Sequence, residues 1–97
     1  MENDFGYIVV SHHVIRQKRP IGYIFREEPE NEADSGWRIY SGQESPNYAD
    51  NPGNFSMFDA AKIIELDPAV EALLNEPYPV EFARYEEDGD FVEVDEN

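Results

Sequence analysis

The chain has 97 residues, a length that predicts one folded domain and leaves no room for a second. Its 22 acidic residues against 7 basic ones give a formal net charge of -15, which disfavours nucleic acids and anionic membranes as partners and favours a basic protein. The hydrophobic content of 40% is too high for a disordered chain, and the absence of cysteine excludes disulfides, zinc–thiolate sites and thiol catalysis.

Apolar runs near the N-terminus predict the first two strands. Residues 6–11 are β-branched and aromatic, which favours a central strand covered on both faces. Residues 12–17 predict one helical turn or a bend, which ends before Pro20. Residues 21–26 then predict a second strand.

An acidic loop and a third strand follow. Proline and dense like charge at residues 27–34 resist regular structure, whereas residues 37–40 alternate in a way typical of a strand with distinct faces. Residues 42–54 are rich in Pro, Gly, Asn and Asp, and predict a long surface loop. Trp37 can be core filler or a surface hot spot for binding, and we favour the core.

Two helices are predicted next. Ser56 and Asp59 have the spacing of a capping box, with Ser56 as the N-cap, so the first helix should run to about Leu66. Its buried stripe would be Phe58, Ala61, Ile64 and Ile63. Asp67 and Pro68 fit the cap and first position of a second, short helix, which buries Val70, Leu73 and Leu74.

The C-terminal region predicts a hairpin. Residues 80–85 and 91–94 are strand-like, and the Asp88-Gly89 pair between them suits a tight turn. The order of elements indicates an α+β fold, with a mainly antiparallel sheet of about five strands and one or two short helices on one face. We expect order over about residues 5–94, with frayed ends. Exposed edge strands would have unpaired backbone groups, through which a homodimer could form.

The sequence pattern supports catalytic and metal-binding roles only weakly. His12 and His13 are adjacent, so they point in different directions, and we interpret them as surface or loop histidines at a strand end rather than metal ligands. Glu27 and Glu28, or Asp34 with another carboxylate, could form an acid and base pair, but nothing in the sequence positions them. The acidic run at residues 86–90 lacks the ligand spacing of a calcium loop. We therefore expect no enzyme, metal or cofactor.

Four segments of the chain resemble a small bacterial domain family. They are residues 6–11, 20–29, 34–42 and 88–94, and Asp34-Ser-Gly-Trp-Arg38 is the most specific part. The family was first described as a domain of unknown function and later as the thirty-third family of polymorphic-toxin immunity proteins. The resemblance implies a cytoplasmic protein that protects its own cell by binding a toxin delivered by neighbouring bacteria. It supplies no catalytic or ligand residues.

The leading hypothesis is an immunity protein that neutralises a toxin domain, expected to be basic, by non-covalent binding. A cytoplasmic location also fits the lack of a signal peptide or membrane-spanning pattern. Tyr40, Tyr48 and Phe55 are aromatic interface candidates near the long loop. The predicted partner-binding residues are Glu27, Glu28, Glu30, Asp34, Tyr48 and Asp50.

The alternative is a regulatory domain that binds a small molecule or peptide. Its pocket would lie between the sheet and the helices, lined by Tyr23, Phe25 and Trp37.

Overall fold

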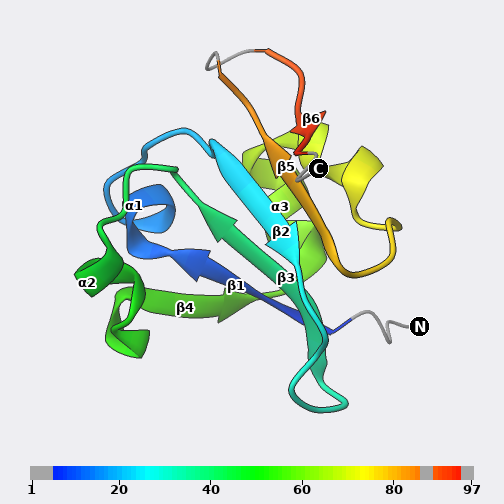
Figure 1. The fold of residues 1–97 in the computed structure, drawn as a ribbon, viewed down its shortest axis with the longest axis horizontal. Helices are drawn as coiled ribbons and strands as arrows, with labels where there is room; N and C mark the ends of the chain where they lie inside the picture. Colours follow the sequence, from blue (N-terminus) through cyan, green and yellow to red (C-terminus); the bar gives the residue numbers. More distant parts are fainter. Residues whose placement is uncertain (1–5, 86–88, 95–97) are drawn as a thin grey trace.

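The computed structural model describes residues 6–85 and 89–94, and their strands form one six-stranded sheet in the order β4-β1-β3-β2-β5-β6 (Figure 1). Neighbouring strands pair antiparallel, except β1 and β3, which are parallel. The predicted α+β class is confirmed, with six strands in place of about five. The elements are β1 (Tyr7–Ser11), α1 (His12–Ile15), β2 (Tyr23–Arg26), β3 (Asp34–Tyr40), α2 (Pro46–Ala49), the 3-10 helix η1 (Pro52–Asn54), β4 (Phe55–Phe58), α3 (Ala60–Leu66), the 3-10 helix η2 (Pro68–Leu73), β5 (Val80–Ala83) and β6 (Val92–Glu93).

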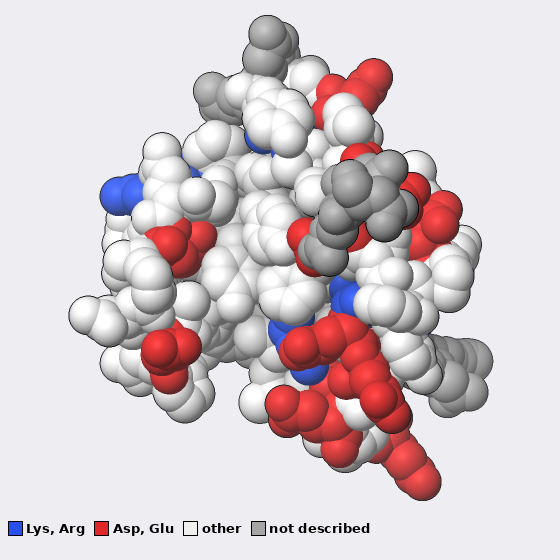
Figure 2. Space-filling model, viewed as in Figure 1, with Lys and Arg blue, Asp and Glu red and all other residues white. Residues whose placement is uncertain are grey.

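The two faces of the sheet have different surroundings. In the β2–β3 pair, Ile24 lies opposite Ile39, while Tyr23 lies opposite Tyr40, and successive side chains of a strand point to opposite faces. The face of the isoleucines lies against α3 and η2, and we call it the packed face (Figure 1). In the described part of the chain, no helix lies across the other face, which we call the open face and which Figure 2 shows from the same direction. The open face carries Tyr7, Val9, Tyr23, Phe25, Arg38, Tyr40, Phe55 and Met57.

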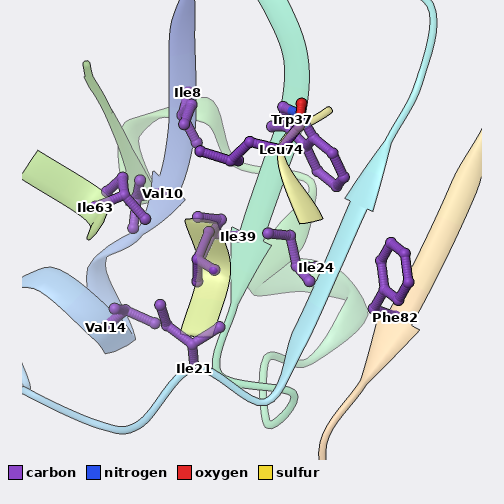
Figure 3. Packing of buried hydrophobic residues seen from close by; sticks show 11 residues of the cluster. Ile8, Val10, Val14, Ile21, Ile24, Trp37, Ile39, Ile63, Leu74 and Phe82 are labelled. Atoms are coloured by element: carbon purple, nitrogen blue, oxygen red, sulfur yellow. The ribbon is translucent and has the colours of Figure 1, made fainter. Parts of the chain in front are cut away.

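The hydrophobic core lies between the packed face and the helices. Trp37 is fully buried, and its indole Nε1 donates a hydrogen bond to the carbonyl oxygen of Leu74 at 3.3 Å. Ile63 of α3 and Val70 of η2 are also fully buried. The prediction that Trp37 belongs to the core is confirmed. The strand residues that meet the helices are Ile8, Val10, Ile24, Trp37, Ile39 and Phe82 (Figure 3).

The segment Asp34-Ser-Gly-Trp-Arg38 forms a bulge at the start of β3. The register between β1 and β3 shifts there, and Gly36 has a φ of +90, a conformation that L side chains rarely adopt. A Cβ on Gly36 would clash with the carbonyl oxygen of Glu27. The hydroxyl of Ser35 donates to the carbonyl of Tyr7 at 2.6 Å and accepts from the amide of Trp37 at 3.1 Å. The segment therefore fixes the backbone that joins β1, β2 and β3.

The predicted first helix begins later than expected. Ser56 is part of β4, and Asp59 caps α3 by accepting a hydrogen bond from the amide of Lys62 at 3.0 Å. The capping-box interpretation was wrong because Asp59 is the cap itself and the four preceding residues pair with β1. Of the predicted stripe, only Ile63 is buried, and Ala61 is exposed.

Other expectations have mixed outcomes. Asp67 accepts from the amide of Ala69, so the cap of the second helix is confirmed, although the helix is 3-10 rather than α. The predicted loop at residues 42–54 contains α2 and η1. β5 and β6 pair antiparallel, as predicted for the C-terminal hairpin. Residues 86–88 of its turn lie outside the described residues, as do residue 5 and the ends predicted to fray, residues 1–4 and 95–97.

The prediction of surface or loop histidines at a strand end was wrong about their exposure, although both residues directly follow the end of β1. His13 is buried in α1 with 8% of its surface exposed, and His12 is half-buried, with its Nε2 2.9 Å from the hydroxyl oxygen of Ser56.

Within residues 6–85 and 89–94, the helices are too short or too polar to cross a bilayer.

Candidate binding surface

Aromatic side chains form a continuous strip across the open face. The ring of Tyr40 lies 5.3 Å from that of Phe55 and 5.7 Å from that of Phe25, measured between centroids. Tyr23 extends the strip at 6.1 Å from Tyr40, and Tyr48 extends it at 6.3 Å from Phe55. All five side chains are half-buried. The solvated face of an antiparallel sheet usually carries polar residues, so an exposed aromatic strip marks a candidate binding surface.

Two hollows flank Tyr40 on this face. The larger, of about 610 Å³, lies between Tyr23, α2 and Tyr85, and we call it the Tyr85 hollow. The smaller, of about 450 Å³, has Phe25, Arg38 and Phe55 in its lining, and we call it the Arg38 hollow. Because Tyr40 and Ala49 line both, the two hollows form one depression along the strip.

Carboxylates surround the aromatic strip. Figure 2 shows uncharged surface in the middle of the open face, with acidic side chains around it and the largest acidic group at the loop between β2 and β3. Glu27 and Glu30 line the Arg38 hollow, and Glu44 lines the Tyr85 hollow. Burial, reinforced by the negative charges of Glu44 and Glu27, raises the pKa of the Tyr40 phenol. The face is therefore apolar in its centre and negative at its rim.

Arg38, which lines the Arg38 hollow, forms a buried ion pair with Asp34. The guanidinium of Arg38 donates to both oxygens of Asp34, at 2.9 and 2.8 Å, and its Nε donates to Oε2 of Glu27 at 2.7 Å. The hydrogen bonds from Arg38 hold the pKa of Asp34 well below its ordinary value, against the opposing effect of burial. Asp34 also accepts from the amides of Gly36 and Glu30, both at 2.9 Å. This carboxylate therefore organises the loop that carries Glu27 and Glu30.

The predicted partner-binding residues fall into four groups by exposure and location. Glu27 and Glu30 are exposed and meet at the Arg38 hollow, whereas Glu28 and Asp50 are exposed but line neither hollow. Asp34 is 4% exposed and occupied by Arg38, so its carboxylate is not offered to a partner. Tyr48, the remaining predicted residue, is half-buried at the end of the aromatic strip.

The predicted ligand pocket wrongly grouped Trp37 with residues from the opposite face of the sheet. The pocket expected between sheet and helices needed Tyr23, Phe25 and Trp37 on one face, but Trp37 lies on the packed face and the other two lie on the open face. Strand alternation was the signal that could have separated them. Arg38 was missed because its role depends on a bulge that the sequence pattern does not reveal.

A buried Ser–His–Glu cluster holds the loop after β3 against α1. Nδ1 of His13 lies 3.0 Å from Oγ of Ser41 and 3.5 Å from Oε2 of Glu44. In a catalytic triad the hydroxyl and the carboxylate contact opposite nitrogens of the imidazole, whereas here both approach the same one. Burial opposes ionisation of Glu44, but hydrogen bonds from Ser11 and Ser41 keep its pKa below the ordinary value. The cluster is therefore arranged to anchor the loop that carries Tyr48.

Metal-ligating side chains do not gather elsewhere: in the part of the chain that the structure describes, no group of three or more His, Asp or Glu residues could hold a metal ion.

Comparison with known protein families shows what the chain is similar to. Residues 8–95 match the family model of the immunity protein Imm33 domain. No curated protein matches the chain, and no solved structure matches it.

Proposed function

The chain belongs to the Imm33 family of immunity proteins, and on that premise we propose that it neutralises a toxin domain by non-covalent binding through the open face of its sheet. The observation that carries the proposal is the half-exposed aromatic strip centred on Tyr40, rimmed by carboxylates. Aromatic residues dominate the energetics of protein interfaces, and tyrosine combines a large contact area with a polar tip.

The acidic rim favours a basic toxin domain. Glu27, Glu28, Glu30 and Asp50 are exposed, and they add to a formal net charge of -15. Opposite charge on the partner accelerates encounter, and contact with the aromatic strip slows dissociation. Tyr48 would extend the contact at the end of the strip. A toxin that acts on a polyanion such as nucleic acid has the basic surface that this arrangement suits.

Neutralisation in this proposal is stoichiometric occlusion in the cytoplasm. The protein covers the toxin's substrate-binding surface and makes or breaks no covalent bond. The proposal requires a 1:1 mixture to abolish toxin activity, with inhibition that follows the amount of complex and not the time of incubation.

The test uses the toxin domain encoded beside the gene for this protein. Its association rate constant, measured by surface plasmon resonance, should fall at least about tenfold between about 0.05 and 0.5 M salt. Glu28→Gln should slow association, while Glu65→Gln, an exposed charge on α3, should change it much less. An association rate constant that does not change with salt concentration would contradict the electrostatic part of the proposal. Full activity of the toxin in the 1:1 mixture would contradict the whole proposal.

A second candidate, a regulatory domain for a small molecule or peptide, is favoured by the Tyr85 hollow. Its volume of about 610 Å³ is within the range of ligand pockets. A metabolite that raises the melting temperature of the wild type but not of Tyr23→Ala would support this candidate. No shift across a metabolite panel, together with toxin binding, would exclude it.

A further inference from the structure

We propose that the Arg38 hollow receives an arginine side chain of the toxin, whose guanidinium pairs with Glu27 and Glu30 against the aromatic strip. This inference rests on the proposed function and names the group that the partner presents. The hollow is lined by aromatic residues of the open face and by both glutamates, and it lies where the strip meets the acidic loop.

The charges around the hollow are unbalanced. Asp34 and Arg38 neutralise each other, since both Asp34 oxygens are occupied by the Arg38 guanidinium. Glu27 shares only Oε2 with Arg38, and its side chain remains 49% exposed. The exposed carboxylate of Glu30 has no partner among the described residues. Three carboxylates against one guanidinium leave two negative charges, which a cation entering the hollow would offset.

The lining favours a guanidinium over an ammonium group. A guanidinium is planar, stacks on aromatic faces and pairs with carboxylates in a fixed geometry, and it is more weakly hydrated than an ammonium ion. The rings of Phe25, Tyr40 and Phe55 provide such faces beside the two carboxylates. The protein uses the same contact internally, because the guanidinium carbon of Arg84 lies 4.3 Å from the ring centroid of Phe91.

The hollow also lies in the middle of the surface that would bind the toxin. Phe25 and Arg38 are neighbours in the β2–β3 register, and Val9 and Met57 continue the same row across β1 and β4. In the complex, the toxin would cover a side chain inserted there and exclude water from it, which is the setting of an interface hot spot.

The experiment titrates the isotope-labelled full chain with N-acetyl-L-arginine amide and follows chemical shifts by NMR. The matched probes are the uncharged N-acetyl-L-citrulline amide and N-acetyl-L-lysine amide. We expect saturable shifts at Val9, Tyr40 and Met57 with a dissociation constant on the order of 10 mM, as a single exposed cation site allows. The citrulline compound should bind at least about fivefold more weakly, and the lysine compound at least about threefold more weakly.

The variants Glu30→Gln and Glu28→Gln provide a matched comparison. Both remove one negative charge from the same loop, but only Glu30 lines the hollow. Glu30→Gln should weaken binding of the arginine compound by about threefold, whereas Glu28→Gln should change it by less than about 1.5-fold. Equal effects, or equal binding of the lysine compound, would overturn the inference.

Different results would overturn the inference and the proposed function. Toxin binding at the open face with no shift from the arginine compound would overturn the inference alone. Shifts from the arginine compound with a toxin that does not bind the open face would overturn the proposed function.

Discussion

The packed face and the open face are built from the same strands by alternate residues, yet their side chains have different surroundings. On the packed face Ile24, Ile39 and Trp37 are completely removed from water by α3 and η2. On the open face Phe25 and Tyr40 stack on each other while part of each ring stays in solvent. The contrast teaches that the apolar core of the fold lies on one face, which leaves the aromatic side chains of the other face partly exposed.

The largest expected effect tests the packed face. Trp37→Ala should lower the free energy of unfolding by about 3–5 kcal/mol, because it leaves a cavity among fully buried side chains and removes the hydrogen bond to Leu74. Phe25→Ala, on the open face, should cost less than about 1.5 kcal/mol because its ring is already partly in water. Urea unfolding followed by circular dichroism measures both. Equal losses would remove the distinction between the faces.

A buried ion pair on the open face provides the next prediction. Asp34→Asn should cost about 3 kcal/mol at neutral pH, because the guanidinium of Arg38 keeps its burial but loses its main counter-charge. Arg38 depresses the pKa of Asp34, so the stabilisation is complete above the ordinary pKa of an aspartate and is lost as the pH falls towards the folded-state value. The difference between wild type and variant should therefore shrink below about pH 4.

Urea midpoints of both proteins at pH 7, 4 and 3 provide the measurement. A difference that stays constant down to pH 3 would mean that the ionised Asp34 does not stabilise the fold through Arg38.

The aromatic strip should be critical for binding and less important for folding. Tyr40→Ala should weaken toxin binding by about 30-fold, the effect of losing a central hot spot, since Tyr40 contacts Tyr23, Phe25 and Phe55. Leu66→Ala, an exposed apolar residue at the end of α3, is the control and should leave affinity unchanged. Isothermal titration calorimetry with the toxin domain measures both. Similar affinities for the two variants would place the interface elsewhere.

Much of the fold could be predicted from local sequence. The apolar runs located β1, β2 and β3, and Asp67-Pro68 located η2, because these signals depend on neighbouring residues. β4 was missed because Ser56 and Asp59 imitate a capping box, whereas the actual strand depends on pairing with β1, far away in the chain.

The candidate site was less predictable. The carboxylates Glu27 and Glu30 were named from the sequence, but the Arg38 hollow combines side chains from four strands, whose order only tertiary structure reveals. The burial of Asp34 depends on the bulge at Gly36, which changes the register between β1 and β3. Charge and composition thus predicted the kind of surface, and long-range pairing determined where it lies.

The most direct test of the account compares two exposed methyl-bearing residues on opposite sides of the molecule. Met57 lines the Arg38 hollow and is 65% exposed, while Leu66 ends α3 and is 48% exposed. A soluble paramagnetic agent should broaden the methyl NMR signals of both in the free protein. On binding the toxin domain, Met57 should become protected and Leu66 should remain as accessible as before. Protection of Leu66 with Met57 still accessible would contradict the claim that the open face binds the toxin.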